Sequence, residues 1–309
     1  MNRLPKKRFD LVGIGVSVWD RICLVASLPA RGSVVRAQRV VEGIGGGVTV
    51  AVAMASRLGS RTAMIDHLGD DFAGQQILQR LRDEGVDVDG TEILHSGTSS
   101  VASIWSEIES AERTIVFSPG TASDQFSVPS DLADYVSNAK LLHLNGRHLQ
   151  VCNKAIELAK QTGTLVSFDG GAFRYRDEVI PLMRAADLVI VARQFAECHA
   201  EANGCSIAAD MTGLELAESL QCELKCRLVG VTSGAGGSYF VTQDGHSHFQ
   251  PAMDAEKAID TTGCGDTFHG AFLHRYLSSE AVAESAAFAA FVAGKNAQDV
   301  GGLVYRPES

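Results

Sequence analysis

The chain has 309 residues, of which 45% are hydrophobic and 21% are charged, which is the composition of a globular protein with a sizeable core and not of a disordered one. Its net charge of −10 argues against a nucleic-acid partner, and no apolar run approaches the ~18 residues of a membrane span. The seven cysteines form no C-x-x-C pair, so we expect reduced thiols in a cytoplasmic protein.

In chain order, short apolar strands alternate with helices, several of which stop at a glycine. The predicted strands are 9–14, 62–67, 141–144, 164–169, 187–192 and 227–232, and the predicted helices include 47–58, 71–84, 151–161 and 267–277. This alternation predicts an α/β fold: a doubly wound, mostly parallel sheet with helices on both faces. No linker or repeat is apparent, so residues 1–309 are expected to form a single domain.

Two regions interrupt this pattern, 17–43 and 99–117, which lack helical periodicity and are rich in Val, Ile, Ser and Thr. Residues 101–107 and 113–117 are typical of a hairpin. We therefore expect a small β-sheet that is attached to the α/β body and acts as a lid.

The strongest chemical signal lies in residues 260–272. Gly263 and Gly265 flank Cys264 just before a predicted helix, so peptide N–H groups can converge at a helix N-terminus and form an anion hole. Asp266 follows at its mouth, where a carboxylate is a poor phosphate ligand but a suitable base for an attacking hydroxyl. The alternative is that Asp266 is only a helix N-cap and the glycines only a turn.

Three other features support a ligand-binding site. Residues 231–241 are predicted as strand, Gly-rich turn and strand, in which Thr232 and Gly234 could hold nucleotide phosphates; a plain hairpin is the alternative. Gly43–Gly47 make a second glycine turn at a helix start, and Asp20 follows the first strand at the ligand-binding end of the sheet. The P-loop, the complete dinucleotide fingerprint and the hydrolase elbow are all absent from the sequence.

Together these segments resemble the ribokinase-like (PfkB) carbohydrate kinase family over essentially the whole chain. Residues 260–272 look like the family's C-terminal D-T-x-G-A-G-D motif, and residues 45–51 resemble its N-terminal G-G-x-x-x-N-x-A motif. Asp20 matches an early sugar-binding aspartate, and residues 111–115 resemble the G-E-R-T of the lid.

The resemblance implies ATP-dependent phosphorylation of a hydroxyl on a sugar or sugar derivative, with Mg²⁺ held through the ATP phosphates and K⁺ left open as a further cofactor. A homodimer through the lid sheet is also expected. The site residues implied are the base Asp266; the anion hole Gly263, Cys264 and Gly265; the nucleotide-binding Thr232, Ser233, Gly234 and Gly237; and the substrate-binding Asp20, Gly45, Gly46, Gly47, Thr49 and Arg147.

The chain departs from the family pattern in three places. Cys264 replaces the usual Ala, which leaves the peptide N–H in place. Thr49 replaces a sugar-contacting Asn, which puts the substrate in doubt. The magnesium-supporting N-x-x-E motif is not intact in residues 192–197, where Glu197 is only a weak substitute.

Arg147 follows Asn145 and Gly146 at the end of a predicted strand, and it could bind an acidic or hydroxyl-rich substrate or be a plain surface residue. Ketohexokinases and sulfofructose kinases resemble the chain at this arginine, so a ketose or acidic sugar is a candidate. Two other functions stay open: a nucleoside or small-alcohol kinase of the same fold, and a non-catalytic sugar- or nucleotide-binding regulator. His143, His148 and His269 are interpreted as core or helix-face residues.

Overall fold

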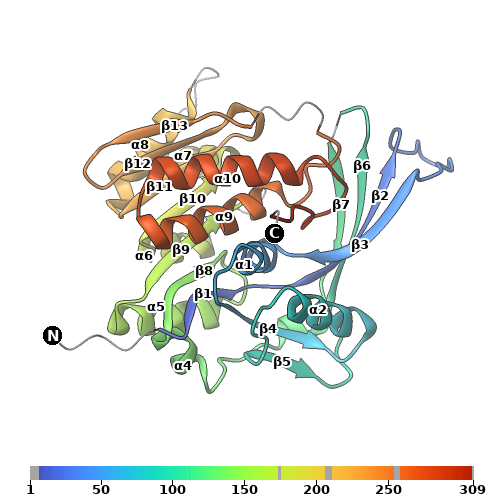
Figure 1. The fold of residues 1–309 in the computed structure, drawn as a ribbon, viewed down its shortest axis with the longest axis horizontal. Coiled ribbons are helices and arrows are strands. Elements are labelled where there is room, and N and C mark those ends of the chain that lie inside the picture. The colour runs from blue at the N-terminus through green and yellow to red at the C-terminus, as the bar shows by residue number, and fades with distance from the viewer. Residues whose placement is uncertain (1–6, 111, 173–174, 206–210, 254–257, 308–309) are drawn as a thin grey trace.

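A computed structural model describes residues 7–110, 112–172, 175–205, 211–253 and 258–307; Ala111, in the expected lid motif, lies outside them. The main sheet has nine strands in the order β13-β12-β11-β10-β9-β8-β1-β4-β5 (Figure 1). The strands are β1 (Phe9–Ile14), β4 (Thr62–Gly69), β5 (Thr91–Leu94), β8 (Ala139–Leu144), β9 (Leu165–Gly170), β10 (Leu188–Ala192), β11 (Leu228–Thr232), β12 (Ser238–Thr242) and β13 (Ser247–Gln250).

All strand pairs of this sheet are parallel except the two that join β11 to β12 and β12 to β13. The mostly parallel sheet is therefore confirmed, as are the six strands predicted from the sequence. The pattern missed β5 and β13, because each is a four-residue strand at a sheet edge with partly exposed side chains.

Helices cover both faces of the sheet, as predicted (Figure 1). Alternate strand residues point to opposite faces, so Leu11 packs with one helix layer and Val12 with the other. The first layer contains α1 (Gly47–Arg57), α2 (Phe72–Asp83), α9 (Cys264–Ser279) and α10 (Val282–Asn296), and the second contains α4 (Leu132–Ser137), α5 (Leu149–Thr162), α6 (Ile180–Ala185), α7 (Arg193–Ala202) and α8 (Gly213–Leu224).

A second, four-stranded sheet projects from this body at the right of Figure 1. Its order is β3-β2-β6-β7, with β2 (Val18–Val25), β3 (Arg39–Gly45), β6 (Ser100–Glu107) and β7 (Arg113–Ser118). The small sheet expected from 17–43 and 99–117 is confirmed, and we call these four strands the lid. Asp20 lies within β2 itself, so it belongs to the lid.

Candidate active site

The anion-hole segment forms the first turn of α9. Gly263 is the N-cap, with a φ of 71°, and a Cβ there would lie 2.2 Å from the carbonyl oxygen of Gly302. The helix begins at Cys264, three residues before the predicted start, so the amides of Cys264, Gly265 and Asp266 lie where a helix has no internal acceptors. A Cβ on Gly265 would meet nothing within 4 Å, which leaves open space beside these amides.

Asp266 is the third residue of α9, and the N-cap position belongs to Gly263, which makes no side-chain cap. The alternative interpretation of Asp266 as a simple N-cap is therefore wrong. Its side chain is only half-buried. A partly accessible carboxylate in the first turn of a helix is an arrangement that a general base for an alcohol can use.

Asp260 fixes the loop in front of the anion hole. Its buried carboxylate accepts hydrogen bonds from the backbone N–H of Thr262 (3.0 Å) and of Gly301 (3.0 Å), and from the Thr262 hydroxyl (2.7 Å). It also accepts a bond from the hydroxyl of Ser106, at 3.1 Å, on the lid strand β6. This residue was part of the recognised motif, but the sequence did not predict its contact with the lid.

Asp20 is buried against the glycine turn. A Cβ on Gly45 would lie 2.1 Å from Asp20 Oδ2, so only glycine leaves room for this carboxylate. Burial, reinforced by the neighbouring carboxylates of Asp266 and Asp260, raises the pKa of Asp20 to about 7. The fold thus brings the predicted sugar-binding aspartate within electrostatic reach of the predicted base.

Thr49 is buried next to the glycine turn. Gly46 has a φ of 90°, and a Cβ there would lie 2.2 Å from the carbonyl oxygen of Val16, so Gly46 is needed for a close turn. Thr49 follows in the first turn of α1, fully buried, with its hydroxyl 2.9 Å from that of Ser17. The Thr49 hydroxyl is therefore engaged with Ser17 and withdrawn from solvent.

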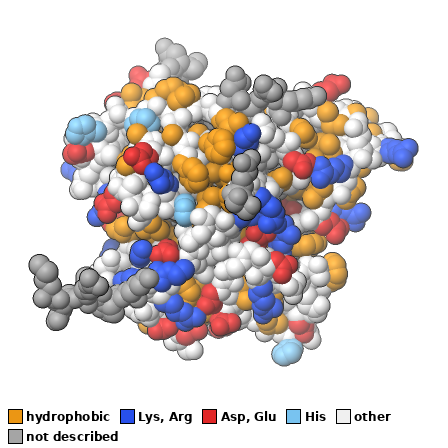
Figure 2. All heavy atoms as spheres, viewed as in Figure 1, with side chains coloured by type: hydrophobic (Ala, Val, Ile, Leu, Met, Phe, Trp, Pro, Cys, Tyr) orange, Lys and Arg blue, Asp and Glu red, His pale blue; other side chains and the backbone are white. Residues whose placement is uncertain are grey.

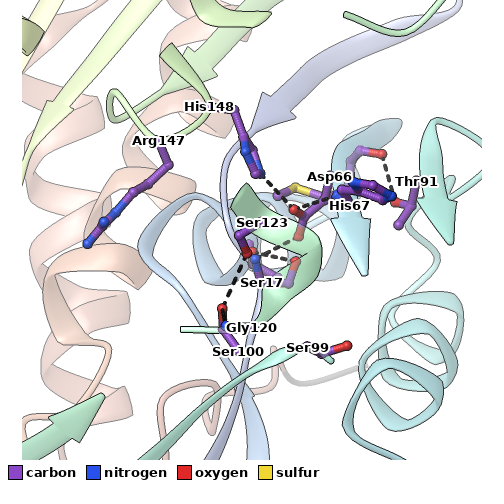
Figure 3. Close-up of polar contacts among 12 residues, drawn as sticks. Ser17, Asp66, His67, Thr91, Ser99, Ser100, Gly120, Ser123, Arg147 and His148 are labelled. Carbon is purple, nitrogen blue, oxygen red and sulfur yellow. Dashed lines mark hydrogen bonds and ion pairs between the residues drawn. The ribbon is translucent and has the colours of Figure 1, made fainter. Parts of the chain in front are cut away.

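Arg147 reaches from the body toward the lid. Its guanidinium carbon lies 5.9 Å from the centre of the Phe117 ring on β7, and its backbone N–H donates to Asn145 Oδ1 at 3.3 Å. In Figure 3 its side chain points away from the buried polar cluster around Ser17. An exposed cation between body and lid is well placed to meet an anionic group of a ligand.

The predicted nucleotide loop follows β11. Gly234 and Gly237 have φ values of 55° and 83°, and a Cβ on Gly234 would meet nothing within 4 Å. The Ser233 hydroxyl is buried with no hydrogen-bond partner among the described residues. Apolar side chains gather where α10 lies in Figure 2, and Phe291 of that helix is exposed. An unpaired hydroxyl, open glycines and an apolar surface fit the phosphates and base of a nucleotide.

Within the described ranges, no three His, Cys, Asp or Glu side chains are grouped to hold a metal ion. Glu197 forms an ion pair with Arg193, whose Nε donates to it at 2.6 Å, so it is already engaged.

Comparisons with known proteins identify relatives of the chain. The sequence model described as pfkB family carbohydrate kinase matches residues 8–307. A nucleoside kinase of Methanothermobacter thermautotrophicus is 24% identical over 97% of this chain and 93% of its own. A fructokinase of Solanum tuberosum is 29% identical over 78% and 74%. The Arabidopsis thaliana ribokinase solved with ribose and ATP superimposes with a TM-score of 0.78 at 22% identity, covering 95% of this chain and 94% of that one.

Proposed function

The chain belongs to the pfkB family of carbohydrate kinases, and from this premise we propose that it transfers the γ-phosphoryl group of ATP to a hydroxyl of a sugar. Asp266 takes the proton from the attacking hydroxyl. The first-turn amides of α9 stabilise the negative charge that develops on the transferred group. ATP with Mg²⁺, when bound, supplies the phosphoryl group and neutralises its charge; Ser233, Gly234 and Gly237 would hold it.

The observation that carries this proposal is the pairing of Asp20 with Asp266. Burial and the charges of Asp266 and Asp260 raise the pKa of Asp20, which supports the proposal that a sugar bonded to Asp20 would lie near the base. Glycines at positions 45 and 46 leave room for it. A regulator that only binds sugar has no use for a base at this point.

For the substrate we propose a ketose or an acidic sugar. Arg147 supports an anionic or hydroxyl-rich group at the boundary between body and lid. The relatives include both a fructokinase and a nucleoside kinase, so a nucleoside remains the second candidate.

A substrate panel tests these proposals. ATP consumption is measured with ketoses, aldoses, sugar acids and nucleosides, in Mg²⁺, with and without K⁺. We expect turnover with a ketose or sugar acid, and Arg147→Ala should raise its KM at least ~10-fold, or about 1.4 kcal/mol. Turnover with nucleosides alone supports the second candidate, and no turnover with any compound supports a non-catalytic regulator.

We also propose that two copies pair through the lid, in the cytoplasm. The six residues of β7 are all exposed at the edge of the small sheet, and Ile115, Val116 and Phe117 among them are apolar. In Figure 2 apolar and basic side chains mix over the lid. Light scattering should give a molar mass of twice that of one chain for the wild type. The Val116→Lys variant should have the mass of a single chain. A monomeric wild-type protein would contradict the pairing.

No helix within the described ranges has the length and apolarity of a bilayer span.

A further inference from the structure

A buried chain of hydrogen bonds joins three strand ends behind the substrate site. Strands β8 and β4 flank β1 in the main sheet, so their carboxyl ends lie on either side of the β1–β2 turn. Asp66, on β4, accepts a hydrogen bond from Nε2 of His148, which follows β8, at 3.0 Å (Figure 3). The other carboxylate oxygen of Asp66 accepts the backbone N–H of Ser17 at 2.7 Å.

The series of hydrogen bonds continues from the β1–β2 turn to the helix α1. The hydroxyls of Ser17 and Thr49 lie 2.9 Å apart, which connects the β1–β2 turn to the first turn of α1. All four side chains are withdrawn from solvent: Asp66 and Thr49 are 0% exposed and Ser17 is 1% exposed, and the His148 side chain is 2% exposed. Hydrogen bonds in such a low-dielectric setting hold their partners in one orientation.

His148 is also held in an unusual backbone conformation. Its φ of 54° and ψ of 55° are left-handed, which a residue with a side chain adopts only when its surroundings impose it. The bond to Asp66 is one such constraint. An edge-on contact between its ring and that of Phe126, with centroids 4.6 Å apart, is another. The turn that carries Arg147 is therefore fixed from the His148 side chain.

The segments that contain His148, Ser17 and Thr49 each carry a residue that is predicted to bind the substrate. Arg147 directly precedes His148, Asp20 lies three residues after Ser17, and Gly47 lies two residues before Thr49. We propose that His148 and Asp66 are positioning residues, which fix Arg147, Asp20 and the glycine turn relative to one another. This proposal rests on the proposed function, because it assumes that these groups bind the substrate.

Three variants test it. His148→Leu removes the donor to Asp66, whereas His148→Gln can place an amide N–H where Nε2 lies. His67→Leu is the matched control, because the His67 ring also packs on Phe126, at 5.4 Å, while its side chain makes no hydrogen bond to Asp66 among the described residues. The measurements are the KM values for sugar and for ATP, the kcat, the melting temperature and the exchange rate of the Ser17 amide hydrogen.

We expect His148→Leu to raise the sugar KM at least tenfold, to leave the ATP KM within about twofold, and to speed exchange of the Ser17 amide. His148→Gln should keep the sugar KM within about threefold of wild type, and His67→Leu should lower only the melting temperature. The proposal is overturned if His148→Leu leaves the sugar KM unchanged, or if both KM values rise together in the two leucine variants. If the wild-type protein phosphorylates none of the compounds, the proposed function is refuted. In that case the positioning role is tested by hydrogen exchange alone, and it is refuted if His148→Leu leaves the exchange rate of the Ser17 amide unaltered.

Discussion

Asp266 is the residue on which the proposed chemistry depends most directly. Asp266→Asn keeps the shape of the side chain but removes its ability to take a proton. We expect kcat to fall by ~10²–10⁴-fold, while calorimetry shows ATP binding within about threefold of wild type. Asp244→Asn, in the exposed turn after β12, is the control and should leave both values unchanged. A variant of Asp266 that retains more than half of the wild-type kcat would show that this carboxylate is not the base.

Asp20 makes substrate binding depend on pH. Because its pKa is raised to about 7, the carboxyl is largely protonated at pH 6 and ionised at pH 8, and only the ionised form accepts strong hydrogen bonds from sugar hydroxyls. The sugar KM should therefore fall as pH rises from 6 to 8. Asp20→Asn should have a higher sugar KM that no longer varies with pH, while the ATP KM stays the same. A pH-independent KM in the wild type would contradict this role.

The same pKa shift predicts an effect on stability. The pKa is higher in the folded chain than the ordinary value of 3.8, so the folded state holds the proton more tightly. The stabilisation from this group is present below pH 4 and is lost as pH rises through 7. Asp20→Asn should therefore melt at a higher temperature than the wild type at pH 8, with a smaller difference at pH 5. Equal differences at the two pH values would contradict this explanation.

At the scale of single residues, the sequence predicted identities better than environments. Asp20, Asp266 and the glycines could be selected because they stand at strand and helix ends, where α/β sheets bind ligands, and because they match the family motifs. The burial of Thr49 could not be predicted, because it depends on a hydroxyl of Ser17 that only the folded turn brings near. His148 was correctly expected in the core, but its partner Asp66 lies 82 residues away in the chain.

At the scale of elements, the start of α9 requires glycine at position 263, and we expect it to tolerate a substitution at position 264. Gly263→Ala forces a side chain into a left-handed conformation, which costs ~1–2 kcal/mol, and onto the carbonyl of Gly302. We expect a lower melting temperature and a kcat reduced at least ~10-fold, because the amides of the anion hole must move. Both would be measured by thermal unfolding and steady-state kinetics.

Cys264→Ala is the matched control for that variant. Burial raises the pKa of the Cys264 thiol to about 12, so the thiol stays protonated and takes no part in proton transfer at neutral pH. The substitution keeps the peptide N–H, and both kcat and melting temperature should stay close to wild type. If Cys264→Ala is as damaging as Gly263→Ala, the side chain at position 264 matters and not the backbone alone.

The same helix shows why element boundaries are difficult to predict. The apolar pattern of α9 begins at residue 267, whereas the helix begins at Cys264, because glycines have low helix propensity and contribute nothing to an apolar pattern. The fold class followed from hydrophobic periodicity, and the small sheet from two segments that lack helical periodicity and are rich in Val, Ile, Ser and Thr; both are properties of the local sequence. Contacts between distant segments, such as Ser106 with Asp260, depend on the assembled chain.

At the scale of the whole molecule, the lid and the body meet next to the anion hole. Arg113 of β7 donates a hydrogen bond to the Thr261 hydroxyl at 2.9 Å, and Ser106 of β6 bonds to Asp260. Arg39 of β3 forms an ion pair with Asp299. The next residue, Val300, packs with the apolar core of the lid. We call these contacts the latch, and they connect the lid to the loop that precedes the predicted base.

The latch leads to a prediction about water. We expect the lid to keep water from competing with the sugar as phosphoryl acceptor, so loosening its contacts with the body should favour hydrolysis. Arg113→Ala removes one partly exposed charged hydrogen bond, which contributes about 1 kcal/mol, roughly a fivefold effect. We expect a several-fold lower kcat for sugar phosphorylation and a several-fold higher rate of ATP hydrolysis without sugar. Arg21→Ala is the control, because Arg21 pairs with Glu42 inside the lid, at 3.9 Å, and should change neither rate. If the two arginine variants behave alike, the contact between Arg113 and Thr261 does not hold the lid, and the exclusion of water must come from other parts of the site.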